Sequence, residues 1–213
     1  MHDNAKAIKV DGKDPQPDII KQAGEIIHHH GVVIFPAKCL YGIAVNAFST
    51  IALNKVFNIK KRPLNKPLLV LIKDESDLEQ LVRSIPEAAK KLIKKFWPGD
   101  LTIVFKAKQG LPDLLTAQTG KIGIRIPKHP VAIALVKQAD MPITGTSANI
   151  SGQQGCSRVS SLEDELISQS DLILDSGTLK GGKGSTVVDV TSPKIKILRI
   201  GEIPEPDIID ALA

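Results

Sequence analysis

Short apolar, β-branched runs alternate with amphipathic helical segments along most of this chain, and this alternation limits its fold more than any other feature. The run "GVVIFP" at residues 31–36, for example, follows a helical pattern of isoleucine and alanine over residues 16–30. The same patterns predict further strands at residues 67–72, 101–107, 121–127, 141–143, 171–175, 185–190 and 195–200, and further helices at residues 49–62, 74–82, 85–99, 131–139, 160–168 and 206–213. Strands and helices alternate early and strands dominate later, so we expect an α/β fold: a single domain over residues 1–213, with a mixed sheet and flanking helices.

Composition narrows the classes of partner and compartment. The net charge of +5 suits an anionic partner, whereas an aromatic content of 3% argues against a surface that stacks nucleic-acid bases. Cys39 and Cys156 lie far apart and form no CxxC pair, which favours a reducing compartment. The N-terminal residues 1–14 contain no apolar core typical of a signal peptide, and no apolar run approaches the roughly 20 residues that span a membrane. We therefore expect a cytoplasmic protein without a membrane segment.

Basic residues gather where the second predicted helix ends. Lys60, Lys61, Arg62 and Lys66 all occur within the stretch "NIKKRPLNKPL". Such a cluster can simply complement the negative end of the helix dipole. Alternatively, Lys60 and Arg62 point into a cleft where the helix unwinds, because two fixed cations suit a polyphosphate.

A second polar signal surrounds the stretch "TGTSANISG" at residues 144–152, which follows the short predicted strand at residues 141–143. Its hydroxyl and amide side chains form either a polar turn or a surface that binds a ligand rich in hydrogen-bonding groups; they belong to Thr144, Thr146, Ser147, Asn149 and Ser151. The apolar strand "IGIRIP" meanwhile contains Arg125, and a charge in a buried strand needs either an acidic partner or a ligand anion.

The glycine-rich stretch "GGKGSTVVDV" resembles a phosphate loop only loosely, because GxxxxGK[ST] is not met and no helix follows. We expect a flexible turn that leaves Ser185 and Thr186 available at its exit. Three consecutive histidines at residues 28–30 point in different directions around a helix, so we predict no metal site there. The chain contains no GxSxG, HExxH or GxGxxG motif.

Taken together, these clusters resemble the YrdC family of L-threonylcarbamoyladenylate synthases. The blocks "GVVIFPAKCLYGIAVNA", "KKRPLNKPLLVLI", "FWPGDLTIVF", "GKIGIRIPKHP", "PITGTSANISG", "STVVDV" and "ILRIGEI" occur in the family's order, from about Gly31 to Ile203. The most specific matches are the K-x-R of Lys60 and Arg62 and the S-x-N of Ser147 and Asn149.

The resemblance implies a YrdC-like fold, with a twisted sheet and a deep basic face, and a nucleotidyltransferase activity. L-threonine, bicarbonate and ATP would give threonylcarbamoyl-AMP and pyrophosphate, with magnesium as the companion of ATP. A separate transferase complex would then pass the threonylcarbamoyl group to tRNA. The implied catalytic residues are Lys60, Arg62, Ser147 and Asn149. The implied nucleotide-binding residues are these four with Thr146, Ser185 and Arg199, and the implied substrate-binding residues are Ala37 and Arg125.

One loop departs from the family pattern. The family usually reads P-T-[DE]-T-x-Y-G, whereas this chain has "PAKCLYG", with Ala37 and Cys39 in place of threonines and Lys38 in place of an acid. We expect weakened threonine affinity, or a different amine as substrate, with ATP binding intact and Lys38 directed to solvent. The alternatives are therefore a paralogue that adenylates another carboxylated amine, and a non-catalytic RNA-binding module that uses the basic face.

Overall fold

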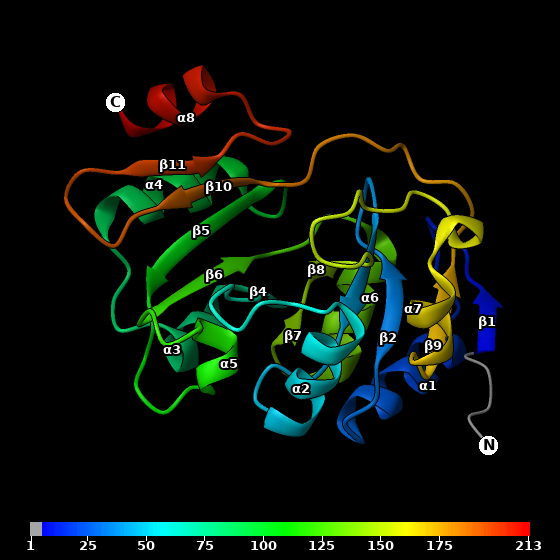
Figure 1. Ribbon diagram of the computed structural model, residues 1–213. Coiled ribbons are helices and arrows are strands. Elements are labelled where there is room, and N and C mark those ends of the chain that lie inside the picture. The colour runs from blue at the N-terminus through cyan, green and yellow to red at the C-terminus, as the bar shows by residue number, and fades with distance from the viewer. Residues whose placement is uncertain (1–5) are drawn as a thin grey trace.

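The computed structural model describes residues 6–213, in which helices pack against two mixed β-sheets (Figure 1). The strands are β1 (Lys6–Lys9), β2 (Val33–Pro36), β3 (Tyr41–Ala44), β4 (Leu69–Leu71), β5 (Leu101–Lys106), β6 (Lys121–Arg125), β7 (Ile143–Thr144), β8 (Thr146–Ser147), β9 (Leu172–Asp175), β10 (Thr186–Asp189) and β11 (Lys196–Arg199). The α-helices are α1 (Pro17–His28), α2 (Thr50–Ile59), α3 (Leu78–Leu81), α4 (Glu87–Phe96), α5 (Asp113–Thr116), α6 (Pro130–Ala139), α7 (Asp164–Ser168) and α8 (Glu205–Leu212), and the short 3₁₀ helices are η1 (Glu75–Asp77) and η2 (Val159–Ser161).

The mixed α/β class predicted from the alternation is confirmed, but the strands form two sheets. The five-stranded sheet has the order β1-β9-β2-β3-β8, and the six-stranded sheet has the order β11-β10-β5-β6-β4-β7. Both combine parallel and antiparallel pairs: β2 is parallel to β9 and antiparallel to β3, and β5 is parallel to β10 and antiparallel to β6.

The two sheets meet at residues 143–147. Ile143 and Thr144 pair with β4 in the six-stranded sheet, and two residues later Thr146 and Ser147 pair with β3 in the five-stranded sheet. Gly145 makes the crossing possible, because a Cβ atom there would lie 2.6 Å from Cγ of Leu71. The chain therefore changes sheet within the polar stretch that the sequence singled out.

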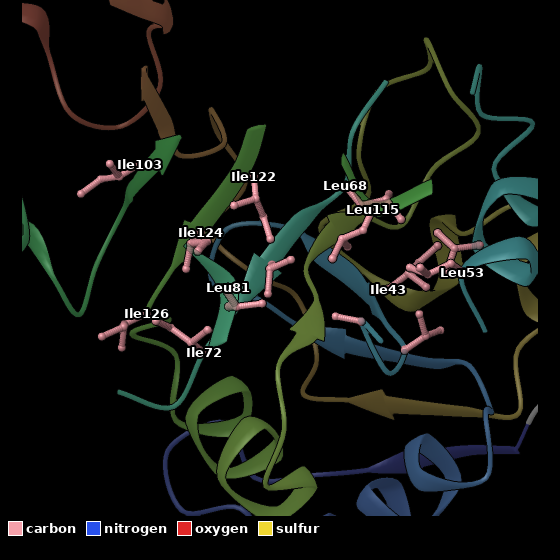
Figure 2. Packing of buried hydrophobic residues seen from close by; sticks show 14 of the residues in the cluster. Ile43, Leu53, Leu68, Ile72, Leu81, Ile103, Leu115, Ile122, Ile124 and Ile126 are labelled. Atoms are coloured by element: carbon pink, nitrogen blue, oxygen red, sulfur yellow. The ribbon is translucent and has the colours of Figure 1, made fainter. Parts of the chain in front are cut away.

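The core consists of two hydrophobic clusters that share strand β2. Val33 and Phe35 face the cluster formed with α1 and α6, whereas Ile34 faces the larger cluster. Burial on both faces explains why this strand is an uninterrupted apolar run. The larger cluster contains residues of both sheets, among them Ile43 of β3 and Ile122 of β6 (Figure 2).

Most predicted elements are present with shifted ends. Ser49 caps α2 as expected, since its side chain accepts a hydrogen bond from the amide of Ala52. Strands β1, β3 and β8 and helix α5 were not predicted. No helix between residues 6 and 213 has the length and apolar character needed to cross a bilayer. Residues 1–5, part of the N-terminal stretch considered above, lie outside the described residues.

Candidate functional site

A cavity of about 580 Å³ is lined by residues of both sheets, in the size range of small-molecule sites. One part of its wall comes from the turn between β2 and β3 and from residues 145–147, and another comes from β5, β6 and β10. Of the site residues predicted from the sequence, those that line the cavity are Ala37, Arg62, Arg125, Thr146, Ser147, Ser185 and Arg199. Lys60 and Asn149 lie behind this wall.

The stretch that begins at Thr144 divides its polar side chains between structure and cavity. Thr144 is fully buried; its hydroxyl donates to the carbonyl of Ile43 and accepts from the amide of Val45, both at 3.1 Å. Its hydroxyl therefore links the two sheets. Thr146 and Ser147, on β8, line the cavity. The stretch is thus both a structural turn and part of the cavity wall.

Lys60 anchors the chain behind Ser147. It follows the last turn of α2, is 1% exposed, and its ammonium donates to the carbonyl oxygens of Ser147, at 2.5 Å, and Asn149, at 2.7 Å. Burial, together with the positive charge of Arg62, lowers the pKa of Lys60 to about 7. The structure thus brings the K-x-R and S-x-N motifs together, with the Lys60 ammonium directed at backbone oxygens.

Asn149 stabilises the turn that follows β8. Its Nδ2 donates to the carbonyls of Ile150, at 2.7 Å, and Gln153, at 2.8 Å. Its Oδ1 accepts a hydrogen bond from the hydroxyl of Ser147 at 2.5 Å. A buried amide with these partners fixes the hydroxyl of Ser147 at the cavity wall.

Backbone oxygens hold Arg62 at the rim of the cavity. Its Nε donates to the carbonyl of Lys66 at 3.1 Å and its Nη2 to that of Pro67 at 2.7 Å. Burial lowers the pKa of Arg62. Neutral acceptors leave the positive charge of this guanidinium uncompensated and available to an anion.

Arg125 is a buried cation of the cavity with an unsatisfied donor group. It ends β6, is 7% exposed and lines the cavity, yet its Nε has no hydrogen-bond partner among residues 6–213. Burial lowers the pKa of Arg125, and the nearby carboxylate of Asp100 acts in the opposite direction. Of the two alternatives for this residue, a partner within the protein or a ligand anion, the geometry favours the ligand.

A further cation, Arg199 of β11, is fixed against β10. Its Nε and Nη2 donate to the carbonyl of Ser185, at 3.1 and 2.8 Å, and Nη2 also reaches the Ser185 hydroxyl at 3.2 Å. That hydroxyl lies 2.7 Å from the hydroxyl of Thr102 on β5. Thr186 points the other way and is fully buried, and its hydroxyl donates to the carbonyl of Ile203. Only the first hydroxyl of the Ser185–Thr186 pair therefore belongs to the cavity.

The prediction that Lys38 points to solvent is wrong. Lys38 lines the cavity and forms an ion pair with Asp100, whose side chain is 16% exposed. A carboxylate 62 positions away in sequence supplies the partner that makes an inward lysine stable. The neighbouring Cys39 is buried, and burial raises the pKa of its thiol.

Sequence reasoning also missed a second ion pair on the wall of the cavity. Lys121 and Asp189 are 2.7 Å apart, and the carboxylate side chain is 7% exposed. Lys121 lies on the same face of β6 as Arg125, because side chains four residues apart on a strand share a face. The alternation of side chains along β6 could have placed Lys121 beside Arg125 at the cavity. Its partner Asp189 could be found only from the fold, which places β10 beside β5.

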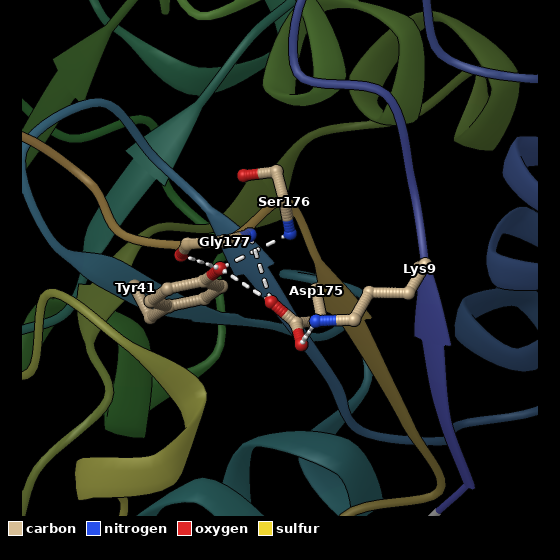
Figure 3. Close-up of polar contacts among 5 residues, drawn as sticks. All are labelled: Lys9, Tyr41, Asp175, Ser176 and Gly177. Carbon is tan, nitrogen blue, oxygen red and sulfur yellow. Dashed lines mark hydrogen bonds and ion pairs between the residues drawn. The ribbon is translucent and has the colours of Figure 1, made fainter.

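A network around Tyr41 fixes the chain directly after β9, where the segment that leads to Ser185 begins; Figure 3 shows this network. The Tyr41 hydroxyl donates to the carbonyl of Gly177 at 2.7 Å and accepts from the amide of Ser176 at 3.1 Å. Asp175 accepts from the amide of Gly177 at 2.8 Å and pairs with Lys9 at 2.5 Å. Burial raises the pKa of Tyr41, so its hydroxyl remains a donor.

The electrostatics of the cavity favour a polyanion. Within the described part of the chain, six cationic side chains and two carboxylates line it, a formal excess of four positive charges. The cations are Lys38, Arg62, Lys121, Arg125, Lys183 and Arg199, and the carboxylates are Asp100 and Asp189. Both carboxylates are already paired with lysines, and residues 6–213 contain no group of three or more histidine, cysteine or acidic side chains placed to bind a metal ion.

Comparisons with known proteins all match the chain to members of one family. The Sua5/YciO/YrdC family model, described as "Telomere recombination", matches residues 25–201. A putative threonylcarbamoyl-AMP synthase of Methanocaldococcus jannaschii is 40% identical over 81% of each chain. The threonylcarbamoyl-AMP synthase of Bacillus subtilis is 37% identical over 92% of this chain, which spans only 56% of that longer relative.

Solved structures of proteins from this family have the same fold as this chain. Pyrococcus abyssi Sua5 complexed with L-threonine superimposes with a TM-score of 0.93 at 31% identity, over 98% of this chain and 61% of its own. Escherichia coli YciO superimposes with a TM-score of 0.85 at 27% identity, over 94% of this chain and 97% of its own. The family match covers most of the chain, including every strand except β1 and all residues that line the cavity, and the chain belongs to the Sua5/YciO/YrdC family.

Proposed function

We propose that this protein is a threonylcarbamoyl-AMP synthase, which forms threonylcarbamoyl-AMP and pyrophosphate from L-threonine, bicarbonate and ATP. The observation that carries the proposal is the set of cations on one cavity, above all the buried and unpartnered guanidinium of Arg125. A relative of the same family is solved with L-threonine, the relative from Bacillus subtilis is named as a synthase of this product, and the one from Methanocaldococcus jannaschii carries the same name marked as putative.

The chemistry needs orientation and charge stabilisation more than a protein nucleophile. The carbamate oxygen of carboxylated threonine attacks the α-phosphorus of ATP, the new P–O bond forms, and the bond to pyrophosphate breaks. Negative charge then grows on the leaving pyrophosphate, where fixed cations are most effective. We assign Arg62 and Arg199 to the nucleotide and Arg125 to the amino-acid carboxylate.

Neutral side chains that form hydrogen bonds would bind the rest of the nucleotide. Thr146, Ser147 and Ser185 would meet ribose or phosphate oxygens without adding charge. Lys60 and Asn149 would position Ser147 from behind, which differs from direct contact of Lys60 with the polyphosphate. Magnesium would arrive on ATP, since the carboxylates of the cavity are engaged by lysines.

Release of pyrophosphate tests the proposal directly. The protein is incubated with ATP, bicarbonate and L-threonine, and each component is omitted in turn. Pyrophosphate that requires all three supports the assignment, together with threonylcarbamoyl-AMP detected by mass spectrometry. Pyrophosphate that does not require threonine, or none at all, contradicts it.

The position of Lys38 favours one second candidate, a synthase that carboxylates and adenylates a different amine, because a charged side chain now faces the substrate. Replacing L-threonine by the other standard amino acids in the same assay separates the two. In either case the product would be passed to a transferase complex that modifies tRNA, and we place the reaction in the cytoplasm.

A further inference from the structure

Lys38, Asp100 and Arg125 form a charged cluster in which Lys38 pairs with Asp100 and Arg125 forms no ion pair with any residue that the structure describes. Lys38 sits in the tight turn between β2 and β3, where the amide of Ala37 donates to the carbonyl of Leu40 at 3.1 Å. Its ammonium pairs with Asp100, which immediately precedes β5. Arg125 ends the neighbouring antiparallel strand β6, yet no carboxylate among residues 6–213 forms an ion pair with it.

The three side chains face one space. All of them line the cavity, and the amide of Gly99 donates to the carbonyl of Ile126 at 3.0 Å, which places Asp100 beside the end of β6. Asp100 pairs with the lysine and forms no ion pair with Arg125. Arg125 therefore remains free for a ligand anion.

The chemical form of the substrate gives this pairing a consequence. An amino acid enters as an ammonium zwitterion, and a free carboxylate beside the carboxylate receptor would hold that ammonium in place. The reaction instead needs a neutral nitrogen that carries a carboxylate group, so the negative charge lies on the oxygens of the carbamate. The ammonium loses a proton, the amine takes up bicarbonate, and the balance is R–NH₃⁺ + HCO₃⁻ → R–NHCOO⁻ + H₂O + H⁺.

We propose that Lys38 is a positioning residue that neutralises Asp100, so that the cavity accepts the amino acid as its carbamate anion in preference to its ammonium form. The inference rests on the proposed function, because it concerns the carboxylated substrate of that reaction. An Asp100 without its lysine would bind the ammonium and repel the carbamate. With the lysine in place, that end of the cavity attracts the carbamate, whose oxygen must reach the α-phosphorus.

The test compares Lys38→Met with a matched control. Lys73→Met also removes a lysine from a lysine–aspartate pair, here with Asp140, and neither residue lines the cavity. In bicarbonate-free buffer, calorimetry with L-threonine should show about 10-fold tighter binding to Lys38→Met, the lower end for a hydrogen bond between charged groups. In the complete reaction, the same variant should release pyrophosphate roughly 10- to 100-fold more slowly at limiting bicarbonate. Lys73→Met should match the wild type in both measurements.

A second variant separates charge balance from simple loss of structure. In Lys38→Met/Asp100→Asn both charges are gone, so most of the lost rate should return and the tighter threonine binding should disappear. Equally slow single and double variants would overturn the inference, and so would unchanged threonine affinity in Lys38→Met. A wild-type protein that releases no pyrophosphate contradicts the proposed function itself. In that case the threonine affinity of Lys38→Met in bicarbonate-free buffer still tests whether Lys38 neutralises Asp100.

Discussion

At the scale of single residues, Lys60 has the environment with the clearest measurable consequence. Its pKa falls from the usual 10.5 to about 7 because the ammonium is buried. Between these values the unfolded chain keeps a proton that the folded chain has lost. The free energy of unfolding should therefore rise with pH from about 7 to about 10.5, by at most about 1.4 kcal/mol per pH unit from this group. Lys60→Met should lack that rise when urea unfolding is followed at several pH values.

Lys55→Met is the matched control for this experiment. Lys55 belongs to the same helix and its ammonium also donates to a backbone carbonyl, that of His30 at 2.8 Å, but the residue is exposed. Its unfolding free energy should follow the wild-type pH dependence. Parallel curves for Lys60→Met and the wild type would show that Lys60 does not titrate in this range. The Lys60 variant should also lose roughly 2–4 kcal/mol of transition-state stabilisation, because Ser147 is no longer anchored.

Ala37 is the residue at which threonine recognition can be tested by restoring a hydroxyl. Ala37 lines the cavity next to Lys38, so Ala37→Thr would present a hydroxyl group to the substrate. A hydrogen bond to a charged ligand group contributes about 1.5–3 kcal/mol, so threonine should bind roughly 10–150-fold tighter. Calorimetry with L-threonine and with ATP in separate titrations measures the effect. Unchanged threonine affinity would show that position 37 does not limit recognition.

Single residues also show what a sequence can reveal. The sequence marks Arg125 as an unusual charge, because a guanidinium in an apolar strand needs a partner. Its buried Nε has no partner among residues 6–213, and binding of a ligand anion there stays a prediction. The ion pair of Lys38 with Asp100 was not predictable, since no local pattern links positions so far apart. The sequence therefore identifies unusual charges, whereas only the fold identifies their partners.

At the scale of elements, the crossing from β7 to β8 depends on a glycine. A Cβ atom at position 145 would lie 2.6 Å from Cγ of Leu71 and 3.0 Å from both of its Cδ atoms. Gly145→Ala should therefore displace either Leu71 or the strand that carries Ser147, at a cost of about 1–3 kcal/mol in the free energy of unfolding. Urea unfolding measures the cost, and pyrophosphate release should fall with it.

Two further variants test the steric origin of this effect. Gly12→Ala meets only the Ser176 side chain, at 3.5 Å, so its stability should stay near that of the wild type. Leu71→Ala alone should cost about 2–5 kcal/mol by leaving a cavity. Combined with Gly145→Ala it should cost less than the sum of the two, because the truncated side chain makes room for the methyl group. Strict additivity would contradict the contact.

The same scale shows why some elements were missed. The helices α1 and α4 were predicted because their apolar residues recur at helical spacing. Strand β3 was missed because "YGIA" follows a turn without the Asn-Gly or Asp-Gly signal of a hairpin. Strand β8 contains only Thr146 and Ser147, so neither its length nor its polarity indicates a strand.

At the scale of the whole molecule, hydrophobic periodicity predicted the class of fold but not the division into two sheets. Periodicity reports which residues are buried, and it does not say which sheet a strand joins. We propose that the chain is nevertheless one domain, because the larger hydrophobic cluster contains Ile34 and Ile43 of one sheet and Ile103 and Ile124 of the other. The cavity lies where residues of both sheets meet, which is why its two walls come from distant parts of the sequence.

The charge of the whole molecule separates a nucleotide enzyme from an RNA-binding module. The chain carries a net charge of +5, and the cavity-lining residues described by the structure carry a formal excess of four. Cations that converge in a cavity favour a compact polyanion, whereas single-stranded RNA needs an extended basic groove and aromatic stacking platforms.

ATP should therefore bind several-fold more weakly when potassium chloride rises from about 0.05 to about 0.5 M, and uncharged adenosine should show little change. An unstructured oligonucleotide RNA, added at the concentration of its strands, should not displace ATP in the same titration. Displacement by RNA with a steeper salt dependence than that of ATP would favour the binding module, because release of many counterions requires an extended contact with the phosphate backbone.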